Sequence, residues 1–87
     1  MPTYVARIAQ DGKILLERAE VTVEQLDPER WRGRFFVPAG MRLLRGLPVE
    51  LAFADGRHGR ARVDHVHPAL SRRGPRLAEI TGTAPIS

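Results

Sequence analysis

The 87-residue sequence contains no cysteine, and lysine occurs only once, at position 13. The absence of cysteine excludes disulfides, thiolate metal sites and thiol nucleophiles, and it fits a reducing compartment. No apolar run approaches the length of a transmembrane helix, and the N-terminus lacks the basic and apolar segments of a signal peptide. We therefore expect a cytoplasmic protein with no membrane partner.

Groups that carry catalysis are also scarce in this chain. Ser71 and Ser87 are the only serines, and neither lies in the strained turn that is typical of a nucleophile. Asp11 and Asp55 are explained as turn residues, and the sequence has no glycine-rich phosphate loop. We expect a protein that is not an enzyme and that uses no cofactor.

Positive charge is plentiful by comparison. Lys and Arg total 14 against 10 Asp and Glu, which gives a net charge of +4 and a pI of about 11.0. Arginine accounts for 13 of the 14 basic residues. This preference fits bidentate recognition of phosphate or carboxylate, and it equally fits a GC-rich genome that favours arginine codons. Both explanations remain open from composition alone.

Residues 31–38 (Trp-Arg-Gly-Arg-Phe-Phe-Val-Pro) contain the only tryptophan and two of the three phenylalanines. At a period of two, Trp31, Phe35 and Val37 fall on one face, while two arginines and Phe36 fall on the other. The glycine between the inward aromatics predicts the close approach of another side chain or backbone segment. The pattern predicts the central strand of a small β-domain with its aromatic face inward.

An Asp-Gly pair at positions 11–12 predicts a two-residue type I′ hairpin, because both central residues of that turn need positive φ. The turn joins a strand at residues 4–9 to a returning strand that continues through Val23. The apolar face of the returning strand is interrupted at residues 17–18, where we expect a bulge or bend.

A second Asp-Gly pair, at positions 55–56, follows a strand at residues 49–53. A two-residue loop would oppose Leu51 to an arginine. A loop with an odd number of residues instead places Leu51 opposite Ala61 and Glu50 opposite Arg62, which is consistent on both faces.

Three other segments connect or complete the strands. Residues 26–30 predict one helical turn, with Asp27 as its cap and a proline at its first position. Residues 41–47 predict a loop or short helical turn that plugs one end of the sheet. Residues 68–76 predict a mobile basic loop, and residues 77–82 predict the final strand.

These elements predict a single domain over residues 1–87. Its fold class is all-β, a small antiparallel barrel or roll of about six strands with one short helical turn, paired mostly in sequential order. The residues expected to face inward are Tyr4, Ile8, Leu15, Val21, Val23, Trp31, Phe35, Val37, Val49, Leu51, Phe53, Val63 and Ile80.

An arginine-rich sheet face is the strongest candidate binding site. If the strand at 31–37 lies beside the strand at 49–53, outward arginines of the two strands that flank the latter share one face, with the small Ala52 and Ala54 between them. Phe36 shares this face and can stack on a base. Such a face predicts binding of nucleic acid or another polyanion. The alternative is an ordinary solvated surface, because Glu50 lies within it. The predicted set is Arg32, Arg34, Phe36, Arg60, Arg62, Arg72 and Arg73, with Arg76 as an extension.

His65 and His67 form a His-x-His pair, a spacing that zinc sites use on strands. No third ligand is evident nearby, because His58 lies toward the other end of the same strand. We expect partly buried histidines at the inward edge of the barrel and no metal.

Residues 30–34 resemble the Arg-x-x-x-Arg half of the signature of PilZ domains, which are small β-barrels that bind cyclic di-GMP. The other half of that signature, Asp/Asn-x-Ser-x-x-Gly, has no counterpart, because residues 55–59 lack the serine and the spacing. The resemblance covers five residues, and membership of that family is not inferred.

The sequence thus predicts a non-catalytic interaction module that binds a protein partner or a second copy of itself. A thin core and the unpaired edges of a short sheet favour a homodimer. Nucleic-acid or other polyanion binding is the alternative.

Overall fold

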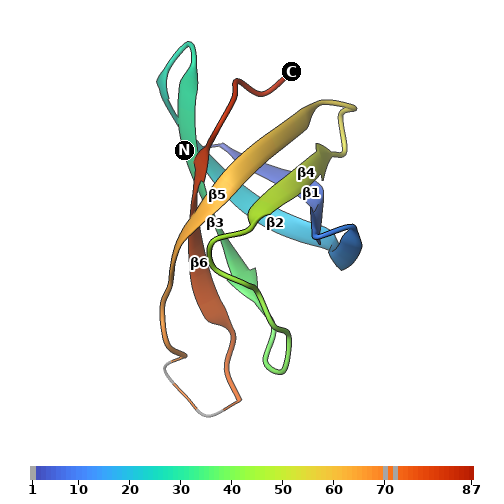
Figure 1. The fold of residues 1–87 in the computed structure, drawn as a ribbon, viewed down its shortest axis with the longest axis vertical. Helices are drawn as coiled ribbons and strands as arrows, with labels where there is room; N and C mark the ends of the chain where they lie inside the picture. The colour runs from blue at the N-terminus through green and yellow to red at the C-terminus, as the bar shows by residue number, and fades with distance from the viewer. Residues whose placement is uncertain (1, 70, 72) are drawn as a thin grey trace.

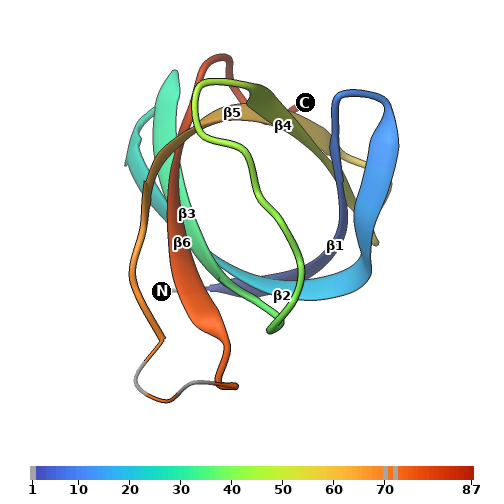
Figure 2. The same cartoon turned by 60° about the horizontal axis from the view of Figure 1, so that its bottom comes forward.

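The computed structural model describes residues 2–69, 71 and 73–87, and within them all regular structure is β. Six antiparallel strands close into a barrel in the order β1-β2-β3-β6-β5-β4, with β4 paired back onto β1 (Figures 1 and 2). The predicted fold class, a small six-stranded antiparallel barrel, is confirmed. The strands are β1 (Thr3–Gln10), β2 (Lys13–Asp27), β3 (Arg30–Val37), β4 (Pro48–Phe53), β5 (His58–Val66) and β6 (Arg76–Gly82).

The strand order corrects the expected neighbours of the central strand. β3 lies between β2 and β6, whereas β4 lies between β1 and β5, so β3 and β4 are not adjacent. Sequential pairing holds within two meanders, β1-β2-β3 and β4-β5-β6. The non-sequential pairs β3–β6 and β1–β4 then join the meanders into a closed barrel, which leaves each strand paired on both sides. The unpaired edges expected of a short sheet are therefore absent from the described strands.

The helical turn predicted at residues 26–30 is wrong. β2 runs on to Asp27, and a tight turn leads into β3 at Arg30. The Asp27 Oδ1 atom accepts hydrogen bonds from the backbone N–H groups of Glu29 (2.9 Å) and Arg30 (2.8 Å). An aspartate makes the same bonds at a helix cap and in an Asx turn, so the Asp-Pro-Glu motif does not distinguish the two.

The β1–β2 hairpin turns as predicted, with positive φ at Asp11 (53°) and Gly12 (75°). The bulge expected near residues 17–18 is present as a register shift between the Ala6 and Ile8 positions of β1. A second shift lies between Ile8 and Ala9. The two bulges bend the 15-residue β2 around the barrel.

The β4–β5 turn has the predicted odd number of residues but a different register. Phe53 N–H donates to the Arg57 carbonyl (2.8 Å), which leaves a three-residue turn that contains Gly56 at φ 95°. Leu51 therefore pairs with Gly59, and Glu50 pairs with Arg60 instead of Arg62. A shift of two residues keeps every side chain on its face, so the apolar pattern alone does not exclude it.

Trp31 is the largest fully buried side chain of the core. Its indole N–H donates to the Ala84 carbonyl (2.8 Å), so the C-terminal segment covers this end of the barrel. A Cβ atom at Gly82 would overlap the indole ring, and one at Gly59 would lie 3.1 Å from it. The predicted inward residues are buried except Tyr4 and Leu15, which are half-buried. Ala6, Ala19, Leu43, Ala61 and Ala78 complete the buried cluster.

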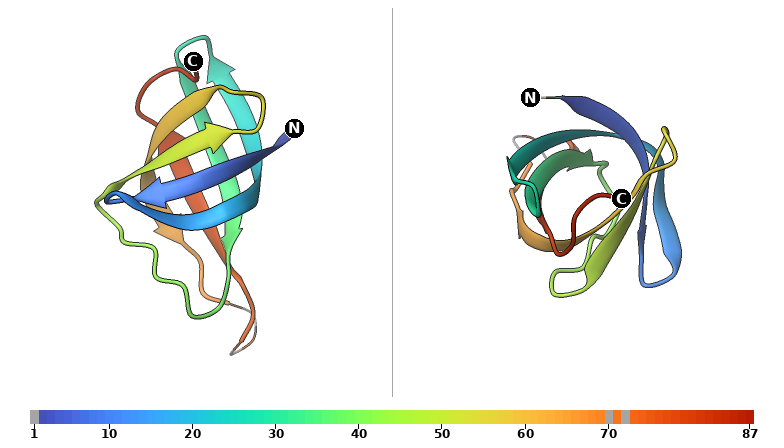
Figure 3. Two further views of the ribbon diagram at one scale, coloured as in Figure 1. Left: turned by 90° about the vertical axis from the view of Figure 1, so that its right-hand side faces the viewer. Right: turned by 90° about the horizontal axis from the view of Figure 1, so that it is seen from above.

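The two long loops extend from the same end of the molecule, because the last residue of β3 pairs with the first of β6. Figures 1 and 3 show the β3–β4 loop (residues 38–47, green) and the described residues of the β5–β6 loop (67–69, 71 and 73–75, orange) together at one end of the longest axis. The β2–β3 turn and the C-terminal segment lie at the other end.

Candidate functional site

The four predicted sheet-face arginines do not form one basic surface. Arg32 and Arg34 on β3 are separated by β6 from Arg60 and Arg62 on β5. Ala52, which was expected between them, lies on β4 at the far side of β5.

Three of these arginines are neutralised by carboxylates on the same or adjacent strands. Arg32 pairs with Glu24 (Nε–Oε2 2.9 Å). Arg60 pairs with Glu50 (Nη2–Oε1 3.0 Å) and Arg62 with Asp64 (Nε–Oδ1 2.9 Å). Arg34 forms no ion pair with a described carboxylate. The face therefore offers far less free positive charge than its arginine count indicates.

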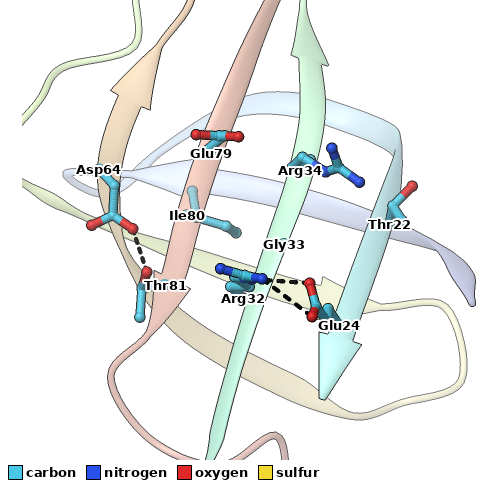
Figure 4. Close-up of a pocket in the computed structure, with 9 residues that line it drawn as sticks. All are labelled: Thr22, Glu24, Arg32, Gly33, Arg34, Asp64, Glu79, Ile80 and Thr81. Carbon is cyan, nitrogen blue, oxygen red and sulfur yellow. Dashed lines mark hydrogen bonds and ion pairs between the residues drawn. The ribbon is translucent and has the colours of Figure 1, made fainter. Parts of the chain in front are cut away.

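In a groove on this outer face, acidic side chains likewise offset the arginines (Figure 4). Its charged side chains are the carboxylates of Glu24, Asp64 and Glu79 and the guanidiniums of Arg32 and Arg34. An excess of acids over bases does not attract a polyanion. The groove is lined by Thr22, Glu24, Arg32, Gly33, Arg34, Asp64, Glu79, Ile80 and Thr81.

Hydrogen bonding keeps two of the groove carboxylates ionised. The side-chain hydrogen bond from Arg32 lowers the pKa of Glu24, and the same bond raises the pKa of Arg32. Partial burial acts to raise the pKa of Asp64, but hydrogen bonds from Thr81 and Arg62 outweigh it, and the pKa is lowered. These negative charges persist at neutral pH and hold their arginine partners.

The predicted aromatic contact, Phe36, points outward as expected and is 61% exposed. It lies near the loop end of β3, opposite Leu77 on β6. It therefore adjoins the end of the barrel from which the long loops extend, two positions beyond Arg34 along the strand.

The histidines lie on the outer side, which corrects their expected inward placement. A bulge between Val63 and His65 shifts the alternation by one residue, so His65 is exposed. His67 Nε2 lies 3.3 Å from Glu79 Oε2, and the two imidazole rings are 4.3 Å apart. Among the described residues, no three His, Asp or Glu side chains are grouped as a metal site requires.

Apart from Lys13, Arg18 and Arg34 on the strands, the positive charge that forms no ion pair with a described carboxylate lies in and beside the two long loops. Residues 38–47 and 67–76 contain five arginines and no Asp or Glu, whereas the other 67 residues carry nine Lys and Arg against ten Asp and Glu. Arg42, Arg45 and Arg73 are exposed, and none forms an ion pair with a described carboxylate. Arg72, also predicted, lies outside the described residues. We call this the arginine-rich end.

Contacts to the barrel hold the β3–β4 loop in place. The buried Gln10 side chain donates to the carbonyls of Leu44 (2.7 Å) and Leu47 (3.1 Å) and accepts from the Leu44 N–H (2.9 Å). Leu43 inserts into the core, which agrees with the prediction that this segment plugs the barrel. The Arg76 guanidinium, at the start of β6, donates to the Met41 carbonyl and so connects the β3–β4 loop to the barrel. Arg42 and Arg45 are thus presented by an anchored loop.

Sequence reasoning named Arg73 and the adjacent Arg76 but missed Arg42 and Arg45. The signal that would have found them is the count of acids by segment, since the two loops are free of acids.

The described residues contain no helix with the length and apolarity of a membrane span. Comparison of the chain with protein-family models, with curated proteins and with solved structures finds no match.

Proposed function

We propose that this barrel is a non-catalytic interaction module of the cytoplasm that binds a polyanionic partner through its arginine-rich end. The observation that carries the proposal is the separation of charge along the barrel. Residues 38–47 and 67–76 contain five arginines and no acid, and the rest of the chain is balanced to within one charge.

Clustered charge of one sign raises the local concentration of an oppositely charged partner and speeds its association. Arginine suits phosphate and carboxylate partners because its planar guanidinium donates two parallel hydrogen bonds. The anchoring by Gln10 and Leu43 supports the proposal further, because a loop that is already ordered loses less conformational entropy on binding.

The arginine-rich end is a better candidate than the sheet face predicted from sequence. On the sheet face, a polyanion would have to displace Glu24, Glu50 or Asp64 from an arginine. At the loop end, Arg42 and Arg45 are exposed without such a competitor among the described residues.

Two double variants of equal charge change distinguish these surfaces. Arg42→Gln with Arg45→Gln removes charge from the loop end, and Arg32→Gln with Arg34→Gln removes the same charge from the sheet face. Fluorescence anisotropy of a labelled single-stranded oligonucleotide, titrated at several salt concentrations, measures the affinity of each. Retention on immobilised heparin gives a second polyanion.

The loop variant should bind more weakly and with a salt dependence shallower by about 1.4, because each phosphate contact on a single strand contributes roughly 0.7 to the slope. The sheet-face variant should bind like the wild type. Equal losses in both variants, or absence of binding to either polyanion at low salt, would refute the proposal.

Self-association is a second candidate function, and the exposed Phe36 beside Leu77 on the outer sheet supports it. The closed barrel removes the edge-to-edge route among the described strands, so a homodimer would form through this apolar surface. Sedimentation equilibrium at increasing concentration should show a dimer that Phe36→Ser abolishes. A monomer at high micromolar concentration would exclude it.

A further inference from the structure

Exposed hydrophobic side chains gather at the arginine-rich end. Leu44 is 42% exposed and Leu47 37% exposed, and both lie in the β3–β4 loop. Leu44 and Leu47 flank Arg45 in a loop of sequence Met-Arg-Leu-Leu-Arg-Gly-Leu. Their backbone groups bond to Gln10, so the barrel holds both leucines at the surface, while the adjacent Leu43 is buried in the core.

The shape of this end restricts the partner. The molecule measures 38 × 24 × 23 Å, and the two loops extend from one end of its long axis (Figures 1 and 3). Exposed arginines and leucines alternate along the β3–β4 loop, beside Asp11 and Glu50 at the position of Leu47. Such an arrangement matches an interface where anionic headgroups lie just above hydrocarbon. A single nucleic-acid strand would gain little from the leucines, since bases bind by stacking on aromatic rings. Among the described residues, Phe36 on β3 is the only phenylalanine or tryptophan whose side chain is exposed for such stacking.

We propose that the arginine-rich end docks on the surface of an anionic lipid bilayer. Leu44 and Leu47 enter the boundary between headgroups and acyl chains, while Arg42, Arg45 and Arg73 contact lipid phosphates and carboxylates. This inference rests on the proposed function and names its polyanion as a lipid surface. It needs no membrane-spanning segment, and it replaces the expectation from composition that the protein has no membrane partner.

Co-sedimentation with vesicles tests the proposal. Vesicles of phosphatidylcholine alone are compared with vesicles of three parts phosphatidylcholine to one part phosphatidylserine, and the oligonucleotide assay runs in parallel. Leu44→Ser with Leu47→Ser removes the aliphatic contacts and keeps every arginine. Leu26→Ser is the matched control, because Leu26 is 44% exposed beside the β2–β3 turn at the opposite end.

Wild type should bind the anionic vesicles and not the neutral ones. The Leu44/Leu47 variant should bind anionic vesicles at least about tenfold more weakly, and Leu26→Ser should not change binding. Arg42→Gln with Arg45→Gln should weaken vesicle binding by about 25-fold, since each arginine near an anionic surface contributes about fivefold. A separate Leu47→Trp reporter should show a blue shift of its emission with anionic vesicles.

The outcomes separate the two proposals. Oligonucleotide or heparin binding without vesicle binding overturns the lipid inference and leaves the proposed function standing. Vesicle binding that the Leu44/Leu47 variant retains in full overturns insertion of the leucines. Absence of binding to vesicles, oligonucleotide and heparin overturns both. Equal urea midpoints for wild type and variants establish that altered binding does not reflect unfolding.

Discussion

Replacement of Gln10 by alanine tests how the barrel supports its arginine-rich end. The Gln10 side chain is 4% exposed and makes three hydrogen bonds to the backbone of the β3–β4 loop. A neutral hydrogen bond contributes about 0.5–1.5 kcal/mol net, and water can replace part of the loss because these bonds are only partly buried. We therefore expect Gln10→Ala to lower the free energy of unfolding by about 2 to 3 kcal/mol, a large share for so small a domain.

Urea unfolding followed by the emission of Trp31 measures this loss, because Trp31 is the only tryptophan and is fully buried. The midpoint should fall while the m-value stays constant. A loss below about 0.5 kcal/mol, the range of ordinary surface substitutions, would refute the assigned role of Gln10.

A Gln10→Glu variant separates the hydrogen bonds from side-chain volume. A carboxylate can accept from the Leu44 N–H but cannot donate to the carbonyls of Leu44 and Leu47. At neutral pH we expect it to be at least as destabilising as alanine. Burial against the two carbonyls should raise the pKa of the introduced carboxyl group in the folded state. The free energy of unfolding of the variant should therefore approach that of the wild type as the pH falls through that pKa.

Three other predictions concern stability. Gly82→Ala should cost at least about 2 kcal/mol, because its Cβ would overlap the indole of Trp31, and an unchanged urea midpoint would contradict that packing. Leu43→Ala should cost about 2 to 3 kcal/mol by the same assay and also weaken polyanion binding, whereas loss of stability alone would mean that the loop stays ordered without its anchor. Because Arg32 lowers the pKa of Glu24 below its ordinary 4.5, the folded state is favoured above that pH and loses this contribution on acidification. The urea midpoint of Glu24→Gln should therefore fall less than that of the wild type as the pH is lowered. If the two midpoints fall in parallel, the Arg32–Glu24 ion pair does not contribute to the pH dependence of stability.

Strands, turns and faces were predictable because each depends on neighbouring residues. The alternation through Trp31 and Phe35 and the Asp-Gly pair at positions 11–12 are local signals, and the structure confirms them. Barrel closure depends on pairing between distant strands, so the β3–β6 contact could not be read from periodicity. The side of His65 was missed because one extra residue in a bulge reverses the alternation without altering the composition.

The candidate site was predicted only in part for a related reason. Whether an arginine is free depends on which carboxylate faces it across the sheet, and the register decides that. Glu50 was expected opposite Arg62, yet it pairs with Arg60, which leaves Arg62 to Asp64. The loop arginines are identified only once these pairs have been assigned.

The placement of the acids distinguishes the two explanations of the arginine excess. Codon bias accounts for arginine in place of lysine, but it does not decide where Asp and Glu lie. Of the eight arginines outside residues 38–47 and 67–76, all but Arg18 and Arg34 pair with a carboxylate, as Arg7 does with Glu17. Residues 38–47 and 67–76 have arginines and no acid at all. Because composition predicts no such separation, the unpartnered charge at one end of the barrel favours a binding function there, and exchange of Arg42 and Arg45 for glutamine tests it directly.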